Sequence, residues 1–161
     1  MTGSRPLTAS STSSGFPTTN VFRLRTGRPL TALVQDWKPT VEARLQELVR
    51  LARGWDGYQG QPVSFGNAVF AFRMLESTCS EDTPVPEIVP GSSGDLQLEW
   101  HLSGGEIELH VRAPNDVHAW RFLAGDSQLQ EELTLSTDFS LVARWLRDLT
   151  ETSLASRAAA A

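Results

Sequence analysis

The amino-acid sequence predicts an α+β fold in which an antiparallel meander of three to four strands is covered on one face by two or three helices. Three observations predict it. Apolar residues recur every three to four positions in two segments before residue 80 and in one after residue 138, as in amphipathic helices. Between residues 95 and 123 apolar and polar residues alternate strictly, as in half-buried strands. Glycine, proline and asparagine separate the alternating segments, as turns require.

The 161 residues suit one domain with a flexible extension, because domains commonly comprise about 100 to 150 residues. The expected organisation is a disordered Ser/Thr-rich tail over 1–20, an arm or linker over 21–39 that holds a short strand or docking arm at 21–25, a single α+β domain over 40–152, and a frayed C-terminus over 153–161. No apolar run approaches the roughly 20 residues that span a bilayer. Residues 1–20 lack the apolar core of a secretory signal, so we expect a cytoplasmic protein without a membrane partner.

Each predicted helix is defined by a capping residue and an apolar stripe. The first helix begins with Thr40 as its N-cap and stops at Gly54, where glycine tolerates the backbone angles that end a helix. Ser64 caps the second helix and Asp138 caps the last. The residues expected to be buried are Val41, Leu45, Leu48, Val49 and Ala52 in the first helix, Phe65, Ala68, Val69, Phe72 and Leu75 in the second, and Phe139, Val142, Trp145, Leu146 and Leu149 in the third.

The alternating segments predict antiparallel strands over 95–102, 106–112 and 117–123, with a weaker fourth strand over 129–135. A two-residue primed turn at Gly104-Gly105 sets the expected register of the first hairpin. The pairs that it places on the apolar face are Leu102–Ile107, Trp100–Leu109 and Leu98–Val111.

The third strand is expected to bring three more residues to that apolar face, among them Phe122 beside Ile107. A second turn over 113–116 places Trp120 beside Leu109, so that Trp100, Leu109 and Trp120 form one row beneath the helices. The same register places His118 on the apolar face as a half-buried packing residue.

The polar face of the predicted hairpin carries a candidate site. The expected register pairs His101 with Glu108 and Glu99 with His110, and sets Ala119 opposite His110. Two imidazoles and two carboxylates within reach of one another can bind a divalent transition metal or carry out acid–base chemistry. The alternative is simple pairing of unlike groups on a solvated face, which stabilises a hairpin by roughly a few tenths of a kcal/mol and needs no ligand.

The loop from Gly54 to Ser64 is the second candidate site. Its glycines permit backbone angles closed to other residues, and Trp55 and Tyr58 supply apolar surface with a polar tip. Asp56 can act as a general acid or base. With no partner for it in the sequence, the better interpretation is an Asx-type turn in which Asp56 anchors the loop. The loop therefore either pins the helices to the sheet or presents a binding surface.

The charge distribution favours a protein partner with a basic surface. The net charge of −5 hides an asymmetry, because residues 1–80 hold nine Arg/Lys against five Asp/Glu and residues 81–161 hold five against fourteen. An acidic half suits a basic partner, although acidity also serves solubility. The single cysteine, Cys79, excludes an internal disulfide and a multi-thiolate metal site. The sequence contains neither a phosphate-cradling glycine motif nor a nucleophile elbow.

Several motifs together carry a resemblance to known proteins. They are LARGWDGY at 51–58, QPVS at 61–64, PEIVP at 86–90, GDLQLEW at 94–100 and the Gly-Gly hairpin that follows. Over roughly 41–122 the chain resembles a widespread set of short bacterial proteins of unassigned function that share a GWDGYG-like loop, a Pro-rich strand and an LEW strand. Gln59 stands where these proteins usually have a small residue. They look like accessory components, sometimes of mobile or defence-related loci, and the resemblance implies a partner-binding role.

These observations favour a non-enzymatic bacterial protein that binds another protein, as an antitoxin-like neutralising subunit or an accessory subunit of a defence or mobile-element system. The candidate partner-binding residues are Trp55, Asp56, Tyr58, Glu99 and Glu108, and neither catalytic residues nor a cofactor are expected. The alternative is a small metal-binding protein or hydrolase that holds a divalent transition metal with Glu99, His101, Glu108 and His110. A nucleic-acid partner is favoured least, because Arg23, Arg25 and Arg28 alone make a poor binding module.

Overall fold

The chain divides into two units, residues 1–33 and 34–161, and the computed structural model describes residues 22–23, 29–30, 36–124 and 130–160. In the first unit, β1 (Phe22–Arg23) pairs antiparallel with β2 (Pro29–Leu30), where the sequence suggests a short strand or docking arm. The predicted tail over 1–20 lies outside the described residues, as do Arg25 and Arg28.

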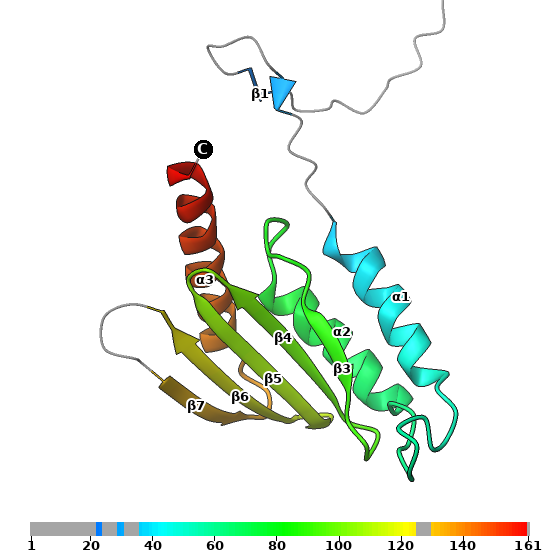
Figure 1. The fold of residues 1–161 in the computed structure, drawn as a ribbon. Coiled ribbons are helices and arrows are strands. Elements are labelled where there is room, and N and C mark those ends of the chain that lie inside the picture. The colour runs from blue at the N-terminus through cyan, green and yellow to red at the C-terminus, as the bar shows by residue number, and fades with distance from the viewer. Residues whose placement is uncertain (1–21, 24–28, 31–35, 125–129, 161) are drawn as a thin grey trace, which may run out of the picture. The chain divides into compact units, whose positions relative to one another are not determined.

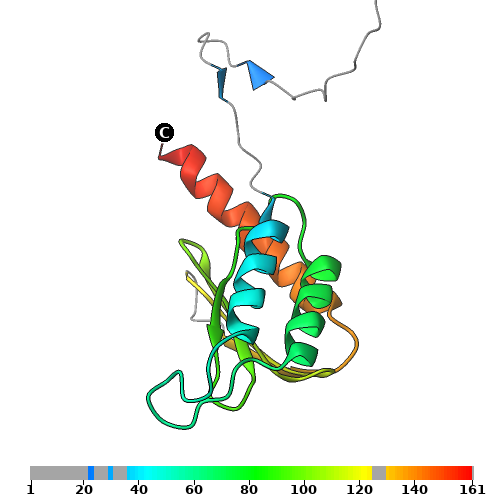
Figure 2. The same cartoon turned by 90° about the vertical axis from the view of Figure 1, so that its right-hand side faces the viewer.

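The second unit is a five-stranded antiparallel sheet with three helices on one side (Figure 1). The strands are β3 (Glu87–Pro90), β4 (Leu96–Leu102), β5 (Gly105–Ala113), β6 (Asp116–Leu123) and β7 (Gln130–Leu135), which lie side by side in chain order. The helices are α1 (Trp37–Val49), α2 (Phe65–Thr78) and α3 (Ser140–Ala159). Figure 2 shows that the described helices leave the other face of the sheet open. The predicted α+β class is confirmed, with five strands in place of three to four.

Helix α1 begins at Trp37, earlier than the predicted start at Thr40. Its N-cap is Asp36, whose side chain accepts a hydrogen bond from the Lys38 backbone N–H (3.1 Å). Pro39 fits in the first turn because the N–H groups there have no acceptor within the helix. The helix ends at Val49, so the predicted stop at Gly54 is wrong, and that glycine instead adopts a φ of +79° in the following loop.

Helix α2 begins at the predicted N-cap, because the Ser64 side chain accepts a hydrogen bond from the Asn67 backbone N–H (3.1 Å). Its buried stripe differs from the predicted one. The buried residues are Asn67, Ala68, Ala71, Met74, Leu75 and Thr78. Phe65 is 72% exposed, and together with Val69 and Phe72 it lines an outward groove of about 580 Å³ between α1 and α2. The largest apolar side chains of α2 therefore do not all face the sheet.

Helix α3 buries the stripe that the sequence predicts for it. The residues of this stripe are Val142, Trp145, Leu146 and Leu149, with Phe139 half-buried just before the first turn. The N-cap is Phe139, so the predicted cap at Asp138 is wrong by one residue, but the Asp138 side chain still accepts a hydrogen bond from the Ser140 backbone N–H (2.9 Å). The helix continues to Ala159, past the predicted domain boundary at residue 152.

The core lies between the three helices and one face of the sheet. Trp100 is 2% exposed there, and its indole N–H donates to the Pro84 carbonyl (2.8 Å). The sheet contributes Leu96, Leu98, Ile107, Leu109, Val111, Val117 and Ala119 to this layer. None of the described helices combines the length and the apolarity that crossing a membrane requires.

The β4–β5 hairpin turns one position earlier than predicted. Ser103 and Gly104 form the turn, and neither has a positive φ, so the turn is not of a primed type. Gly105 belongs to β5, where a Cβ would lie 2.2 Å from the Phe122 carbonyl oxygen, so this position accepts only glycine. The pairs become Leu102–Gly105, Trp100–Ile107, Leu98–Leu109 and Leu96–Val111. The register moves by two residues, and every side chain keeps its predicted face.

The β5–β6 register differs from the prediction by a single residue, which inverts β6. A bulge between Val111 and Ala113 shifts the pairing, so that Leu109 lies opposite Ala119. Because side chains alternate between faces, a one-residue shift moves each β6 side chain to the other face. Trp120 and His118 therefore lie on the open face, and the predicted Trp100–Leu109–Trp120 row beneath the helices is wrong.

Candidate functional site

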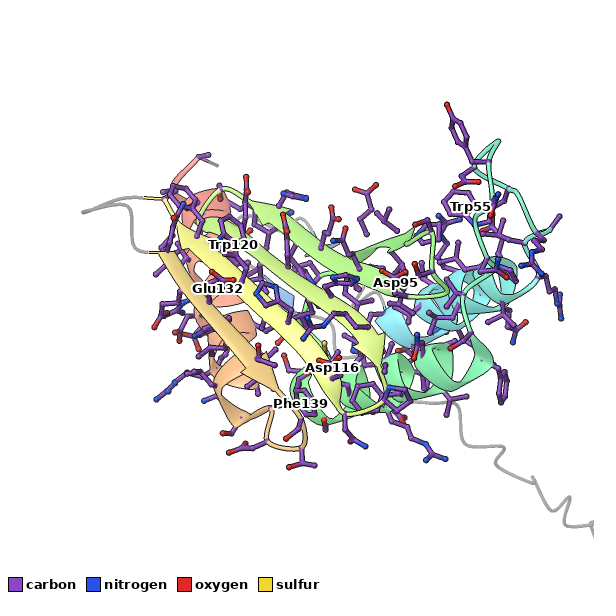
Figure 3. All side chains as sticks on the ribbon, turned by 90° about the horizontal axis from the view of Figure 1, so that it is seen from below. Trp55, Asp95, Asp116, Trp120, Glu132 and Phe139 are labelled. Atoms are coloured by element: carbon purple, nitrogen blue, oxygen red, sulfur yellow. The ribbon has the colours of Figure 1, made fainter. Side chains whose placement is uncertain are left out.

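The open face of the sheet carries one row of residues that crosses all five strands. Direct cross-strand partners link Glu87 to Glu99, Glu99 to Glu108, Glu108 to Trp120 and Trp120 to Glu132. We call these five residues the glutamate row. Figure 3 labels Trp120 and Glu132, which come from β6 and β7. Four carboxylates and one indole thus lie in register on a face that the described helices leave uncovered.

The glutamate row is not an arrangement that stabilises the sheet. Like charges directly opposite each other destabilise a strand pair. Glu99 faces a glutamate on both sides, and its side chain is only 18% exposed, which limits screening by solvent. Within the chain, His101 beside Glu99 and His118 beside Glu132 offset part of this repulsion. Additional cations or basic groups from a partner would lower it further.

A shallow hollow of about 290 Å³ opens within this face. Its lining residues are Gln97, Glu108, His110, His118, Trp120 and Glu132. His110 and His118 lie directly opposite each other on β5 and β6, and the Glu132 carboxylate accepts a hydrogen bond from His118 Nε2 (2.7 Å). Trp120 is half-buried. The hollow therefore combines hydrogen-bonding groups, carboxylates and one aromatic surface.

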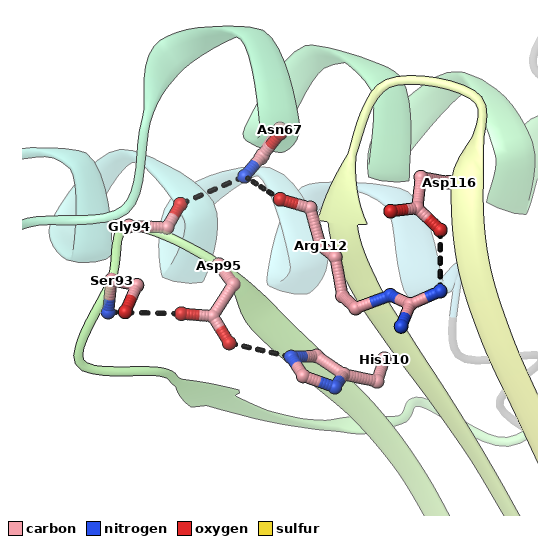
Figure 4. A network of polar contacts seen from close by, with 7 residues as sticks. All are labelled: Asn67, Ser93, Gly94, Asp95, His110, Arg112 and Asp116. Carbon is pink, nitrogen blue, oxygen red and sulfur yellow. Dashed lines mark hydrogen bonds and ion pairs between the residues drawn. The ribbon is translucent and has the colours of Figure 1, made fainter.

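One wall of the hollow is held by Asp95, which lies in the turn before β4 (Figure 4). Its carboxylate pairs with His110 Nε2 and accepts a hydrogen bond from the Ser93 backbone N–H (3.0 Å). Desolvation pushes the pKa of Asp95 up, but the hydrogen bonds from His110 and Ser93 outweigh it, so this pKa lies below its usual value. The carboxylate is thereby kept ionised, and it fixes the orientation of the His110 ring.

The same turn is tied to the helical layer. The buried Asn67 side chain donates to the Gly94 carbonyl (2.8 Å) and to the Arg112 carbonyl (3.3 Å). The Arg112 guanidinium in turn donates to the Asp116 carboxylate (2.6 Å) across the β5–β6 turn (Figure 4). Buried polar groups that are fully bonded in this way rigidify their surroundings. Hydrogen bonds thus connect α2 to the turn that carries Asp95, the partner of His110.

The structure does not bring the predicted Glu/His set together. His101 lies at the far end of β4, where its ring is 3.1 Å from the Glu99 carboxylate and 3.8 Å from that of Glu106. The hydrogen bond to Glu99, helped by the charge of Glu106, raises the pKa of His101. The predicted pairs His101–Glu108 and Glu99–His110 are wrong, because Glu108 lies opposite Glu99 and His110 opposite Gln97.

His118 also replaces the predicted Ala119 as the residue opposite His110. Among residues 36–124 and 130–160, no three His, Cys, Asp or Glu side chains come close enough to share a metal ion.

The loop between α1 and α2 is anchored as the Asx-turn interpretation predicts. Asp56 Oδ1 accepts hydrogen bonds from the backbone N–H groups of Tyr58 and Gly60 (both 2.9 Å), and these two bonds lower the pKa of Asp56. Trp55 lies back against the loop, because its indole N–H donates to the Gln61 carbonyl (2.9 Å). The side chain of Tyr58 points outward and is 88% exposed. The loop is therefore architecture that presents one exposed aromatic residue.

The loop adjoins the end of the sheet where Asp95 lies (Figure 3). Gln61 donates from its backbone N–H to the Ser92 carbonyl (2.9 Å) and forms an isolated bridge with Ser93. Ser93 in turn donates to Asp95, which pairs with His110. Hydrogen bonds thus connect the loop, the 92–95 turn and the hollow.

Sequence reasoning missed Glu87, His118, Trp120 and Glu132 as members of this site. Glu87 lies in β3, whose four residues are too few to display alternation. The predicted register of β6 is wrong by one residue, which places His118 and Trp120 on the wrong face. The acidic residues of the predicted polar strands are the one signal in the sequence, and they indicate Glu99 and Glu108.

Comparison with models of known protein families, with curated proteins and with solved structures finds no match for this chain.

Proposed function

We propose that this chain is a protein-binding module whose open sheet face receives a basic surface of another protein, and that it acts as an accessory or neutralising subunit. The glutamate row carries the proposal. A face selected only for solubility has no need to align Glu87, Glu99 and Glu108 opposite one another, where they repel. A basic surface of a partner would be attracted to these carboxylates. The repulsion that destabilises the free chain would then be relieved in the complex.

The hollow supplies the chemistry that an arginine or lysine side chain requires. Glu108 offers a carboxylate directly beside the Trp120 ring. A guanidinium group can stack on an indole and pair with a carboxylate at the same time. Glu132 is the partner of Trp120 on β7 and adds a second carboxylate, which already accepts a hydrogen bond from His118. Glu108 is half-buried, and partial burial strengthens such a pair relative to one in bulk water.

The exposed aromatic of the loop extends this surface. Tyr58 is rigidly presented, because Asp56 fixes the turn that carries it. Tyrosine is enriched at protein interfaces, since it buries a large area with few rotatable bonds. The loop and the open face are joined through Ser93 and Asp95, so one partner can cover both.

Binding of an arginine-rich peptide tests the proposal. We expect the double variant Glu99→Gln/Glu108→Gln to bind it about tenfold more weakly than the wild type, because about two close ion pairs are lost. The matched control is Glu42→Gln/Glu151→Gln, which removes the same charge from exposed positions on α1 and α3. If both double variants weaken peptide binding equally, the effect comes from net charge alone, and the proposal is overturned.

A further inference from the structure

The two edges of the sheet are built differently. β3 is four residues long, follows Pro86 and ends at Pro90. Its Ile88 carbonyl accepts hydrogen bonds from Nε (3.2 Å) and Nη2 (3.1 Å) of Arg44 on α1. Short length, proline and side-chain cover are the devices by which natural proteins prevent an edge strand from pairing with another chain. The β3 edge is therefore closed.

The β7 edge lacks the short length, the proline and the side-chain cover of β3, and its only protective feature of this kind among the described residues is the charge of Glu131 and Glu132. The strand is six residues long and contains no proline. Within the described part of the chain it pairs with β6 alone, and Figure 1 shows it at the border of the sheet. In an antiparallel edge strand every second residue directs its N–H and C=O away from the neighbouring strand. β7 thus presents a ladder of backbone donors and acceptors that the described residues do not use.

The side chains of β7 define what can pair there. On the open face, Glu132 brings the glutamate row to the edge, and its side chain is 70% exposed. On the helix face, Leu133 and Leu135 are half-buried and pack against the core, and Glu131 at the start of the strand pairs with Arg121. Side chains of an added strand would point alternately to the two faces of the sheet. Those on the open face would lie beside Glu132, and those on the helix face would lie beside these leucines. The complementary strand alternates basic and apolar residues.

We propose that β7 is a docking edge at which an extended segment of the partner, with basic residues alternating with apolar β-branched ones, adds as a sixth strand. This inference deepens the proposed function and rests on it. In β-strand addition the main-chain hydrogen bonds supply affinity and the alternate side chains supply specificity. A second copy of the chain fits less well, because pairing β7 with itself gathers Glu131 and Glu132 of both copies along one seam.

Hydrogen exchange of the β7 amides, followed by NMR on the full chain, tests the inference. The probe is a peptide of alternating arginine and valine, and the control peptide has the same composition with its arginines in one block. In the free protein, alternate β7 amides should exchange quickly. At saturation the alternating peptide should slow these amides at least about tenfold, and the block peptide should not. A version of the alternating peptide with methylated backbone nitrogens should not slow the exchange of the β7 amides, because it cannot donate the backbone hydrogen bonds of the ladder.

The remaining outcomes separate the inference from the proposed function. If Glu99→Gln/Glu108→Gln weakens peptide binding while the β7 amides stay unprotected, the docking edge is wrong and the open-face function stands. If binding does not depend on these glutamates, the proposed function fails and the inference fails with it. If the β7 amides of the free protein become protected as its concentration rises, a second copy occupies the edge and the inference is overturned.

Discussion

Glu108 lies directly opposite Trp120 across β5 and β6, on the face of the sheet that the described helices leave open. This pairing exists because of the bulge between Val111 and Ala113, which turns β6 over relative to a regular hairpin. A carboxylate beside an indole ring is a surface that suits a guanidinium or ammonium group. The bulge therefore places the aromatic component of the proposed binding face.

Two tryptophan substitutions should have very different effects on stability. Trp100→Ala removes a side chain that is 2% exposed and should lower the free energy of unfolding by about 3–5 kcal/mol. Trp120→Ala removes a half-buried side chain from the open face, and we expect a loss of about 1 kcal/mol. Urea denaturation of the two variants measures both values. Equal large losses would mean that Trp120 lies in the core and that the β6 register is wrong.

Gly105→Ala should be far more destabilising than Gly57→Ala. Both glycines have a positive φ, +142° and +82° respectively. A Cβ at Gly105 would lie 2.2 Å from the Phe122 carbonyl oxygen, whereas a Cβ at Gly57 meets nothing within 4 Å. We expect a loss of about 1 kcal/mol at Gly57 and of more than about 3 kcal/mol at Gly105, measured by thermal or chemical unfolding. Similar losses at both positions would contradict the close approach of β5 to β6.

Asp95 should make the folded state sensitive to acid. Its pKa is lowered in the folded chain, because the hydrogen bonds from His110 and Ser93 outweigh desolvation. A group with a depressed folded pKa stabilises the protein above its unfolded pKa, about 3.9 for Asp, and this stability is lost as pH falls through the folded value. Asp95→Asn should therefore flatten the dependence of the free energy of unfolding on pH below about pH 4. An unchanged slope would mean that the Asp95–His110 pair does not form.

The control for this measurement is Asp82→Asn, at an exposed position in the loop after α2. It should leave the acid limb of the curve unchanged. Asp56 and Asp138 also have lowered pKa values, from backbone hydrogen bonds, so Asp95→Asn should reduce the slope and not abolish it.

Cys79 should react slowly with alkylating reagents in the native protein. Burial raises the pKa of its thiol to about 11, while a hydrogen bond with Thr78 acts weakly in the opposite direction. Only the thiolate reacts, and a free cysteine has a pKa of about 8.5. At pH 8 we therefore expect iodoacetamide to modify the native protein at least about 100-fold more slowly than the urea-unfolded chain. Comparable rates would show that the C-terminal end of α2 is open to solvent.

The sequence predicted the strands of the β4–β7 meander to within a residue or so, but not their registers. Alternate residues of β6 lie on opposite faces of the sheet. The set that contains His118, Trp120 and Phe122 has larger apolar side chains than the set that contains Val117, Ala119 and Arg121. Hydrophobicity alone therefore assigns the wrong set to the core. The position of the bulge decides between the sets, and the segment Ala113-Pro114-Asn115-Asp116 looks like an ordinary turn in the sequence.

Helix α2 shows the same difficulty for a helix. Ala68 and Leu75 of its predicted stripe are buried, but Phe65, Val69 and Phe72 line the outward groove, and Asn67 and Ala71 face the core instead. Small residues allow a helix to approach a sheet closely, and Asn67 is buried because it bonds to carbonyl groups on two other segments. The hydrogen-bond partners of Asn67 are distant in the sequence, so no local pattern predicts them. The loop after α1 was more predictable, because Asp56 bonds to its own neighbours.

The NMR signals of the indole N–H groups give the most direct test of the open-face account. On titration with the arginine-rich peptide, we predict that the Trp120 signal shifts and saturates with the binding curve. The Trp100 signal should stay in place, because that indole is buried and bonded to Pro84. Binding that shifts another indole and leaves Trp120 unmoved would contradict the account.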